Sequence, residues 1–171
     1  MQFLTKDQCA AWASKERFPF SEAPNYQDLE KVGFHNTHFP TPPDAGRRVA
    51  LARILWNTFS DRSERLLWVT EWGVWPSSEH MPLYVSLRQA LGDKRRLIDA
   101  PGHLFQLGED DNGLSFLIVA ALFYWDVYLL GAGGDFAAFL SHDEYCVVLS
   151  RDAVQRAEME QRLASFIEPA A

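Results

Sequence analysis

The chain has 171 residues, of which 47% are hydrophobic and 23% charged, and its formal net charge is −7. This length and composition are typical of a globular domain with its own core, so we expect residues 1–171 to form a single domain. Proteins that bind nucleic acid usually present a basic patch to phosphate groups. The acidic balance therefore argues against nucleic acid and favours a basic protein partner.

The cysteines and the apolar stretches bear on location. Cys9 and Cys146 are too few for a disulfide scaffold, and we expect both to be buried free thiols. The N-terminus has neither the basic start nor the apolar stretch of a signal peptide. Residues 114–133 are strongly apolar, but only twelve of them precede the charge of Asp126, whereas a membrane-spanning helix needs about 20. We expect a soluble, cytoplasmic protein without membrane association.

The first predicted elements are helices on either side of a proline-rich segment. Thr5, followed by Gln8, forms a capping-box pattern that predicts a helix from Thr5 to about Lys15. Residues 18–44 contain five prolines and several large aromatic residues, which indicates a wrapping segment with one short strand at 33–39. Apolar residues at helical spacing then predict a helix from Pro43–Asp44 to about Phe59.

The second half of the chain is predicted to contain most of the sheet. Residues 65–72 have the composition of a central strand, and a helix should run from about Ser78 to Leu91. Residues 93–113 are either a long functional loop or contain a short strand at His103–Leu107. A buried helix at about 114–123, a hairpin over 124–141, a strand at 145–149 and a last helix capped by Ser150 or Asp152 complete the chain.

The order of these elements predicts the fold class. Hairpin-length connections cannot join parallel neighbours, so the last three strands should form an antiparallel meander. We expect an α+β fold (mixed α/β) in which helices pack on a mixed sheet with this C-terminal antiparallel meander.

Common catalytic motifs do not occur in the sequence. GxSxG, HExxH and CxxC motifs are all missing, which excludes the familiar hydrolase, zinc-protease and redox templates. GAGGD at 131–135 lacks the spacing of a phosphate-binding loop and is better interpreted as a hairpin turn. We predict no cofactor and no metal.

One loop is the leading candidate for ligand binding. In residues 70–80 a predicted strand ends and a helix begins, and ligands in α/β folds often bind at such junctions because helix N-terminal amides are unpaired there. Trp72 and Trp75 could form aromatic walls, while Ser77 and Ser78 could donate hydroxyl groups. In the alternative interpretation the tryptophans pack the core and the turn, and Ser78 only caps the helix.

Several ionisable residues are candidates for acid–base chemistry. These are Glu71, His80, His142 and Glu144. Each also has a structural interpretation, as a core histidine or as part of a polar strand junction. Asp126 lies in an apolar run, and a buried carboxylate must be paired, hydrogen-bonded or protonated. Its partner could be a backbone turn, Arg88 or His142, and we include Asp126 among the ligand-binding candidates.

Three hypotheses for function remain. The first is a non-catalytic binding or inhibitor-type domain that recognises a protein partner, by analogy with bacterial inhibitor and immunity proteins of similar size and charge. The second is a small-molecule-binding protein that uses the loop from Trp72 to Ser78. The third is a small enzyme of unfamiliar template, in which the four ionisable candidates and Asp126 gather at one end of the sheet.

Overall fold

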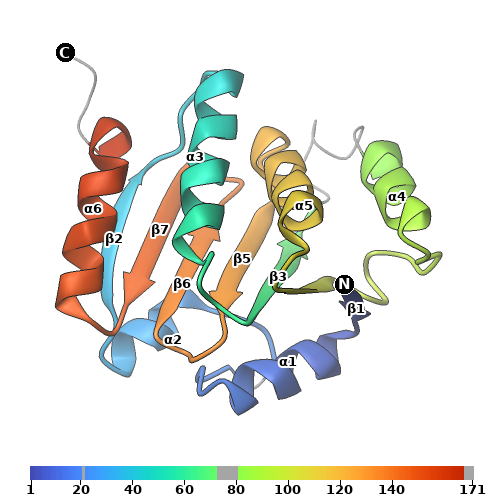
Figure 1. The fold of residues 1–171 in the computed structure, drawn as a ribbon, viewed down its shortest axis with the longest axis horizontal. Helices are drawn as coiled ribbons and strands as arrows, with labels where there is room; N and C mark the ends of the chain where they lie inside the picture. Colours follow the sequence, from blue (N-terminus) through green and yellow to red (C-terminus); the bar gives the residue numbers. More distant parts are fainter. Residues whose placement is uncertain (21, 73–80, 168–171) are drawn as a thin grey trace.

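The computed structural model describes residues 1–20, 22–72 and 81–167, and these form one seven-stranded sheet and six helices (Figure 1). The strands are β1 (Gln2–Leu4), β2 (His35–Pro40), β3 (Glu64–Glu71), β4 (Gly102–Gln106), β5 (Asp126–Gly131), β6 (Phe136–Leu140) and β7 (Tyr145–Ser150). The helices are α1 (Lys6–Lys15), α2 (Tyr26–Lys31), α3 (Ala45–Thr58), α4 (Met81–Ala90), α5 (Asp110–Leu122) and α6 (Ala153–Ile167).

The sheet has the strand order β1-β4-β3-β5-β6-β7-β2. Strands β5, β6 and β7 are consecutive neighbours that pair antiparallel, which confirms the predicted C-terminal meander. The α+β class, with helices packed on the sheet, is confirmed as well.

The remaining pairs of described strands are also antiparallel, so the sheet is antiparallel throughout where we expected a mixed one. Helix α5 carries the chain from the end of β4 back to the start of β5, and these two strands run in the same direction. They do not pair, however, because β3 lies between them and is antiparallel to both.

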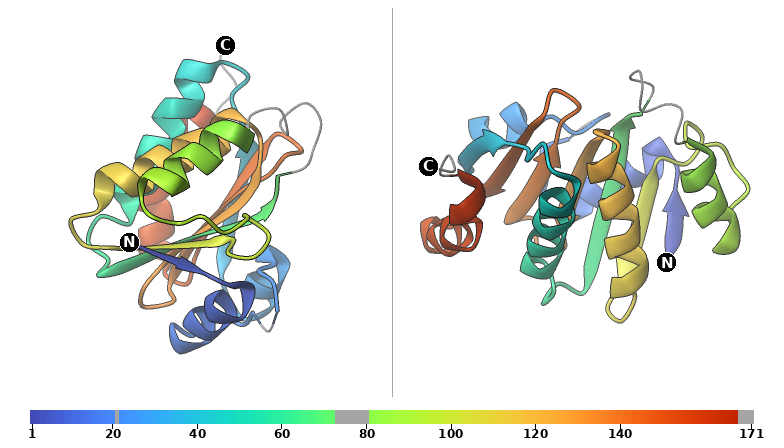
Figure 2. Two further views of the ribbon diagram at one scale, coloured as in Figure 1. Left: turned by 90° about the vertical axis from the view of Figure 1, so that its right-hand side faces the viewer. Right: turned by 90° about the horizontal axis from the view of Figure 1, so that it is seen from above.

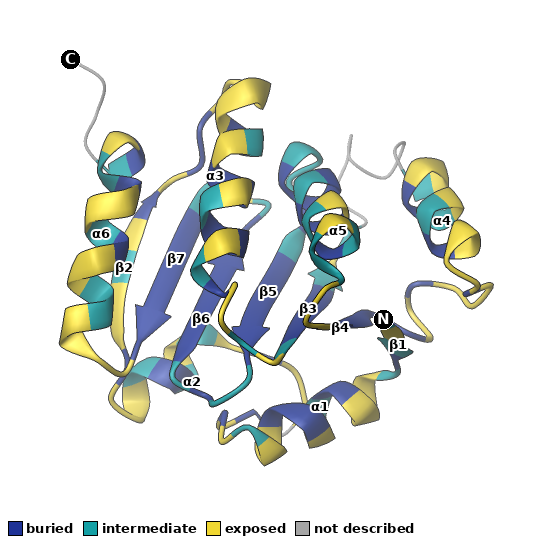
Figure 3. Cartoon of the chain, viewed as in Figure 1, coloured by how far each residue is buried: buried dark blue, intermediate teal, exposed yellow. Residues whose placement is uncertain are grey.

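Both faces of the sheet are buried. Helices α3, α4, α5 and α6 lie on one side, which we call the helical face, and α1 and α2 lie on the other (Figure 2). Side chains alternate along each strand, so Leu67 and Val69 of β3 belong to the core of the helical face, while Leu66 and Trp68 belong to the second core. Figure 3 shows the central strands as almost continuously buried and the outer sides of the helices as exposed.

A glycine allows α3 and α5 to approach each other closely. A Cβ atom at Gly113 of α5 would lie 1.9 Å from Cη2 of Trp56 in α3, a separation that no real pair of atoms tolerates. The indole of Trp56 also donates to Asp110 (3.1 Å), and the guanidinium of the fully buried Arg65 stacks 4.5 Å from its ring centroid. The missing side chain at Gly113 therefore makes room for a large aromatic residue.

In the segment 18–44, Phe18, Phe20, Leu29 and Phe34 pack into the core of the second face, and residues 35–40 follow them as the edge strand β2. The rings of Phe18, Phe20 and Phe34 stack on one another with centroid distances of 5.8 and 6.4 Å, and all three are buried. The predicted short strand is present as β2. The segment also contains α2, which we did not predict, and β1 near the N-terminus was missed too.

Most local predictions are confirmed. Thr5 and Gln8 make both hydrogen bonds of a capping box at the start of α1. The ambiguous segment 93–113 contains a strand, β4, and the apolar stretch 114–133 divides into part of α5 followed by β5. Across residues 1–20, 22–72 and 81–167, no helix has both the length and the apolar character that crossing a bilayer requires.

The two cysteines are free and buried, as predicted. Cys9 belongs to the core of the second face and Cys146 to the core of the helical face, so the sheet separates them. Burial raises the pKa of both thiols, that of Cys9 to about 12. Both cysteines therefore stay protonated and pack as small apolar residues.

Candidate functional site

Asp126 pairs with His142. The Nδ1 atom of His142 lies 2.9 Å from Oδ1 of Asp126, and the backbone N–H of His142 donates to the same oxygen at 2.6 Å. Asp126 thus satisfies two of the predicted alternatives at once, a backbone turn and a histidine, and it fixes the turn between β6 and β7. The third alternative, Arg88, pairs with Asp93 instead.

Other ionisable candidates lie at the same end of the sheet. Glu71, the last residue of β3, is exposed and lies opposite Asp126 in the strand register. Glu144 is exposed in the β6–β7 turn, where its φ of 63° is left-handed. No group of three or more His, Cys, Asp or Glu residues within the described ranges could hold a metal ion. The structure thus brings Glu71, Asp126 and His142 to one end of the sheet, without a metal-binding cluster among the residues it describes.

The predicted loop at residues 70–80 is described only in part. Trp75, Ser77, Ser78 and His80 lie outside the described residues. Trp72 is half-buried and contributes to a cavity of about 420 Å³ beside α4. We call this cavity the α4 pocket, and its lining residues are Trp72, Met81, Val85, Lys94, Arg95, Arg96, Leu97 and Ile98.

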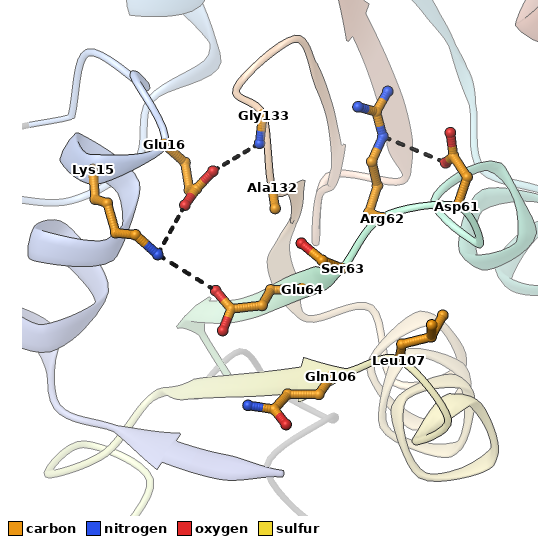
Figure 4. Close-up of a pocket in the computed structure, with 10 residues that line it drawn as sticks. All are labelled: Lys15, Glu16, Asp61, Arg62, Ser63, Glu64, Gln106, Leu107, Ala132 and Gly133. Atoms are coloured by element: carbon orange, nitrogen blue, oxygen red, sulfur yellow. Dashed lines mark hydrogen bonds and ion pairs between the residues drawn. The ribbon is translucent and has the colours of Figure 1, made fainter.

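A larger hollow lies at the opposite end of the sheet from Asp126. It has a volume of about 710 Å³ and lies between the end of α1, the start of β3, the end of β4 and the β5–β6 turn (Figure 4). Its lining residues are mostly polar: Lys15, Glu16, Asp61, Arg62, Ser63, Glu64, Gln106, Leu107, Ala132 and Gly133. We call it the carboxylate groove, after the two glutamates that face each other across Lys15.

These two glutamates are held by neutral hydrogen-bond donors. One carboxylate oxygen of Glu16 accepts the backbone N–H of Gly133 at 2.7 Å, and Oε2 of Glu64 accepts the indole N–H of Trp12 at 2.8 Å. The side chains of Glu16 and Glu64 are only 14% and 25% exposed. Both carboxylates are therefore fixed in place and partly shielded from water.

Lys15 bridges the two carboxylates. Its Nζ atom lies 3.2 Å from Oε1 of Glu16 and 3.9 Å from Oε2 of Glu64 (Figure 4), while its side chain remains 70% exposed. Lys15 is thus the exposed partner of this ion pair and the two carboxylates are the more buried ones.

The β5–β6 turn forms a rigid wall of the groove. Gly134 has a φ of +66°, and a Cβ atom there would lie 1.7 Å from the backbone oxygen of Glu16. The side chain of Arg17 donates to the Gly133 carbonyl at 2.7 Å, and Nε of Arg151 donates to the Gly134 carbonyl at 3.0 Å. The sequence indicated a hairpin turn at these glycines, and the structure adds that the turn is bound to the end of α1.

Tyr84 of α4 and His103 of β4 form a buried polar pair. The hydroxyl of Tyr84 lies 3.2 Å from Nε2 of His103, and neither residue has any exposed surface. Burial and the charge of Arg88 lower the pKa of His103 to about 3, against the opposing effect of nearby backbone carbonyls. His103 is therefore a neutral core residue at physiological pH, a role for which its sequence surroundings gave no signal.

Comparison with known proteins adds no assignment. Neither a protein family, nor a curated protein, nor a solved structure matches this chain. The features of the molecule that bear on function are therefore the carboxylate groove, the α4 pocket and the Asp126–His142 pair.

Proposed function

We propose that this protein is a non-catalytic binding domain for a basic protein partner, and that the partner inserts a lysine or arginine side chain between Glu16 and Glu64. The observation that carries this proposal is the arrangement of two fixed carboxylates around the exposed cation of Lys15. In the free protein, Lys15 takes the position of the partner's cation.

Exchange of the cation requires little free energy. Ion pairs of largely exposed lysines contribute about 0–1 kcal/mol, so displacing Lys15 loses little. The incoming group meets carboxylates that Gly133 and Trp12 already orient, which reduces the entropy lost on binding. An arginine of the partner gains more binding free energy than a lysine, because its planar guanidinium can contact both oxygens of one carboxylate.

The surroundings of the groove also suit a protein partner. Leu107 lines the groove and is 70% exposed, so it offers an apolar contact next to the charged pair. Protein interfaces commonly combine such an apolar contact with polar groups around it. The net charge of −7 would in addition attract a basic partner over distance and raise the association rate at low salt.

A cytosolic location is part of the proposal. Both thiols are free and buried, and neither needs an oxidising compartment for a disulfide.

The test compares three charge variants in affinity capture from the native cytosol at low salt. The double variant Glu16→Gln/Glu64→Gln should lose the partner that the wild type retains. Lys15→Ala should retain it more strongly, because the competing cation is gone. Lys6→Ala is the matched control, since Lys6 is an exposed lysine of the same helix and its removal changes the net charge equally.

The outcome distinguishes binding at the proposed site from general electrostatic attraction by the net charge of the protein. If Lys6→Ala strengthens capture as much as Lys15→Ala, net charge alone explains the binding and the proposed site is wrong. Glu158→Gln, which removes an exposed carboxylate from α6, should leave capture unchanged. Retention of the same partner by the double variant would refute the proposal directly.

A further inference from the structure

We propose that the α4 pocket binds a small amphipathic carboxylate, that is, one carboxylate group on an aliphatic or aromatic body. This site is separate from the carboxylate groove, and the residues that line the two do not overlap. The proposal therefore stands independently of the proposed partner.

Most of the residues that line the α4 pocket are apolar, namely Trp72, Met81, Val85, Leu97 and Ile98. The volume of about 420 Å³ lies within the range of about 300–1,000 Å³ that is typical of small-molecule sites. Ile98 is 64% exposed although it borders the cavity, so an apolar ligand would cover surface that is now in water.

The remaining lining residues are cationic. They are Lys94, Arg95 and Arg96, consecutive residues of an otherwise acidic chain. Arg96 is neutralised by Asp99, to which it makes hydrogen bonds of 2.9 and 3.0 Å. Lys94 is exposed and forms no ion pair with any residue in the described ranges.

A buried ion-pair network fixes Arg95 at the pocket. Asp93 is almost fully buried, and its two oxygens accept from Arg88 at 2.5 Å and from Nε of Arg95 at 2.8 Å. Arg95 also donates to the Phe3 carbonyl at 2.9 Å. Burial raises the pKa of Asp93, but the hydrogen bonds from both arginines outweigh burial and lower that pKa to about 2. Asp93 therefore remains charged, and Arg95 is held rigidly at the pocket.

The network leaves positive charge uncompensated. One carboxylate, that of Asp93, serves two guanidinium groups, and Arg88 is 99% buried with no hydrogen-bond partner for Nε and Nη1 among the described residues. Lys94 adds a further charge. A cationic excess beside apolar lining residues is complementary to a ligand with a negative head and an apolar body. A carboxylate suits the head because it accepts charge-assisted hydrogen bonds from ammonium and guanidinium groups.

The test is a titration of the whole protein with three probes, namely decanoate, decanol and acetate. Decanoate carries both the head and the body, whereas each of the other two carries only one. We expect decanoate to bind at least about tenfold more tightly than either, which corresponds to about 1.4 kcal/mol. Binding is measured by calorimetry below the concentration at which decanoate forms micelles.

Variants locate the site. Lys94→Ala and Ile98→Ser should each weaken decanoate binding about three- to tenfold, and both change exposed side chains, so the fold is retained. The matched controls are Lys31→Ala on α2, a lysine that is 72% exposed, and Val154→Ser on α6, a residue that is 66% exposed. These controls should bind decanoate as the wild type does.

A spectroscopic readout is independent of affinity. Decanoate should shift the tryptophan emission of the wild type, and Trp72→Phe should reduce this shift while calorimetry still detects binding. The proposal is overturned if decanol binds as tightly as decanoate, if acetate does, or if decanoate does not bind. It is equally overturned if the Lys31 and Lys94 variants lose the same affinity, since binding would then be non-specific.

Discussion

His103 makes the stability of the protein depend on pH in a way that can be calculated. Its imidazole is fully buried between Tyr84, Phe116 and Phe3, and its pKa is lowered from 6.5 to about 3. In the unfolded chain the imidazole titrates near its ordinary pKa, so below pH 6.5 the unfolded state takes up a proton that the folded state does not. Acidification therefore favours unfolding.

The difference in proton uptake between the two states sets the sign and the size of the pH effect on the free energy of unfolding. The contribution of His103 is constant above its ordinary pKa of 6.5, and it is lost progressively as the pH falls towards about 3. Within this window the loss approaches about 1.4 kcal/mol per pH unit. Between pH 8 and pH 5 the folded state should thus lose about 2 kcal/mol from this residue alone.

The assay is urea denaturation of the wild type and of His103→Gln at pH 8, 6.5 and 5. The difference between the two proteins isolates His103 from the other titrating groups. The variant is less stable at pH 8, and its disadvantage should shrink by about 2 kcal/mol at pH 5, because glutamine takes up no proton.

A direct measurement covers the case in which the variant does not fold. Nitrogen-15 NMR of the wild-type imidazole should show that His103 remains neutral down to pH 4. A charged His103 at pH 5 would refute the reasoning, as would equal pH dependence of the two proteins in urea.

Three further changes have defined outcomes. Gly113→Ala should lower the urea midpoint by an amount equivalent to about 1–3 kcal/mol, because the new methyl group overlaps Trp56. Alanine usually stabilises a helix relative to glycine, so a higher midpoint would contradict the close approach of α3 and α5. Asp126→Ala should reduce the free energy of unfolding by about 1–3 kcal/mol, since it removes the hydrogen bonds to His142 that hold the β6–β7 turn. The control is Asp143→Ala, which removes a more exposed carboxylate of the same turn and should have little effect. Asp93→Asn should lower the free energy of unfolding by about 3–5 kcal/mol at neutral pH. Its difference from the wild type should diminish between pH 4 and 2, because the unfolded wild type takes up a proton on Asp93 from about its ordinary pKa of 3.8 downwards, whereas the folded carboxyl has a pKa of about 2; a constant difference in acid denaturation curves would argue against the ion pairs.

Elements with strong local signals could be predicted from the sequence, and elements without them could not. Thr5 and Gln8 specify the start of α1 by themselves, and the glycines at 131–134 specify the hairpin turn. Helix α2 has six residues with only Leu29 buried, and β1 has three residues, so neither shows a periodic pattern. Such short elements form because the sheet provides a surface for them.

Local sequence patterns also do not indicate which strands pair with each other. The sequence around α5 resembles the crossover of a parallel pair, because β4 and β5 do run in the same direction. The insertion of β3 between them is decided by tertiary packing, in which Arg65 and Leu67 of β3 join the helical face and Glu64 reaches Trp12 on the other.

The site residues also divide into those with a local sequence signal and those without one. Asp126 could be predicted to need a partner, since a carboxylate in an apolar run must be satisfied, and His142 was one of the alternatives. Glu16 and Glu64 carry no such signal, because each is an ordinary polar residue at the end of its element. Only the fold brings them together around Lys15.

The two edge strands of the sheet affect whether the protein aggregates at high concentration. A long, flat outer strand is a template on which another chain can add and start a fibril. Here one border is β1, with three residues, and the other is β2, which ends in Pro40 and carries mostly exposed polar side chains. A short strand and a proline both discourage such growth, so an aromatic-rich chain with strongly apolar inner strands can remain dispersed once folded.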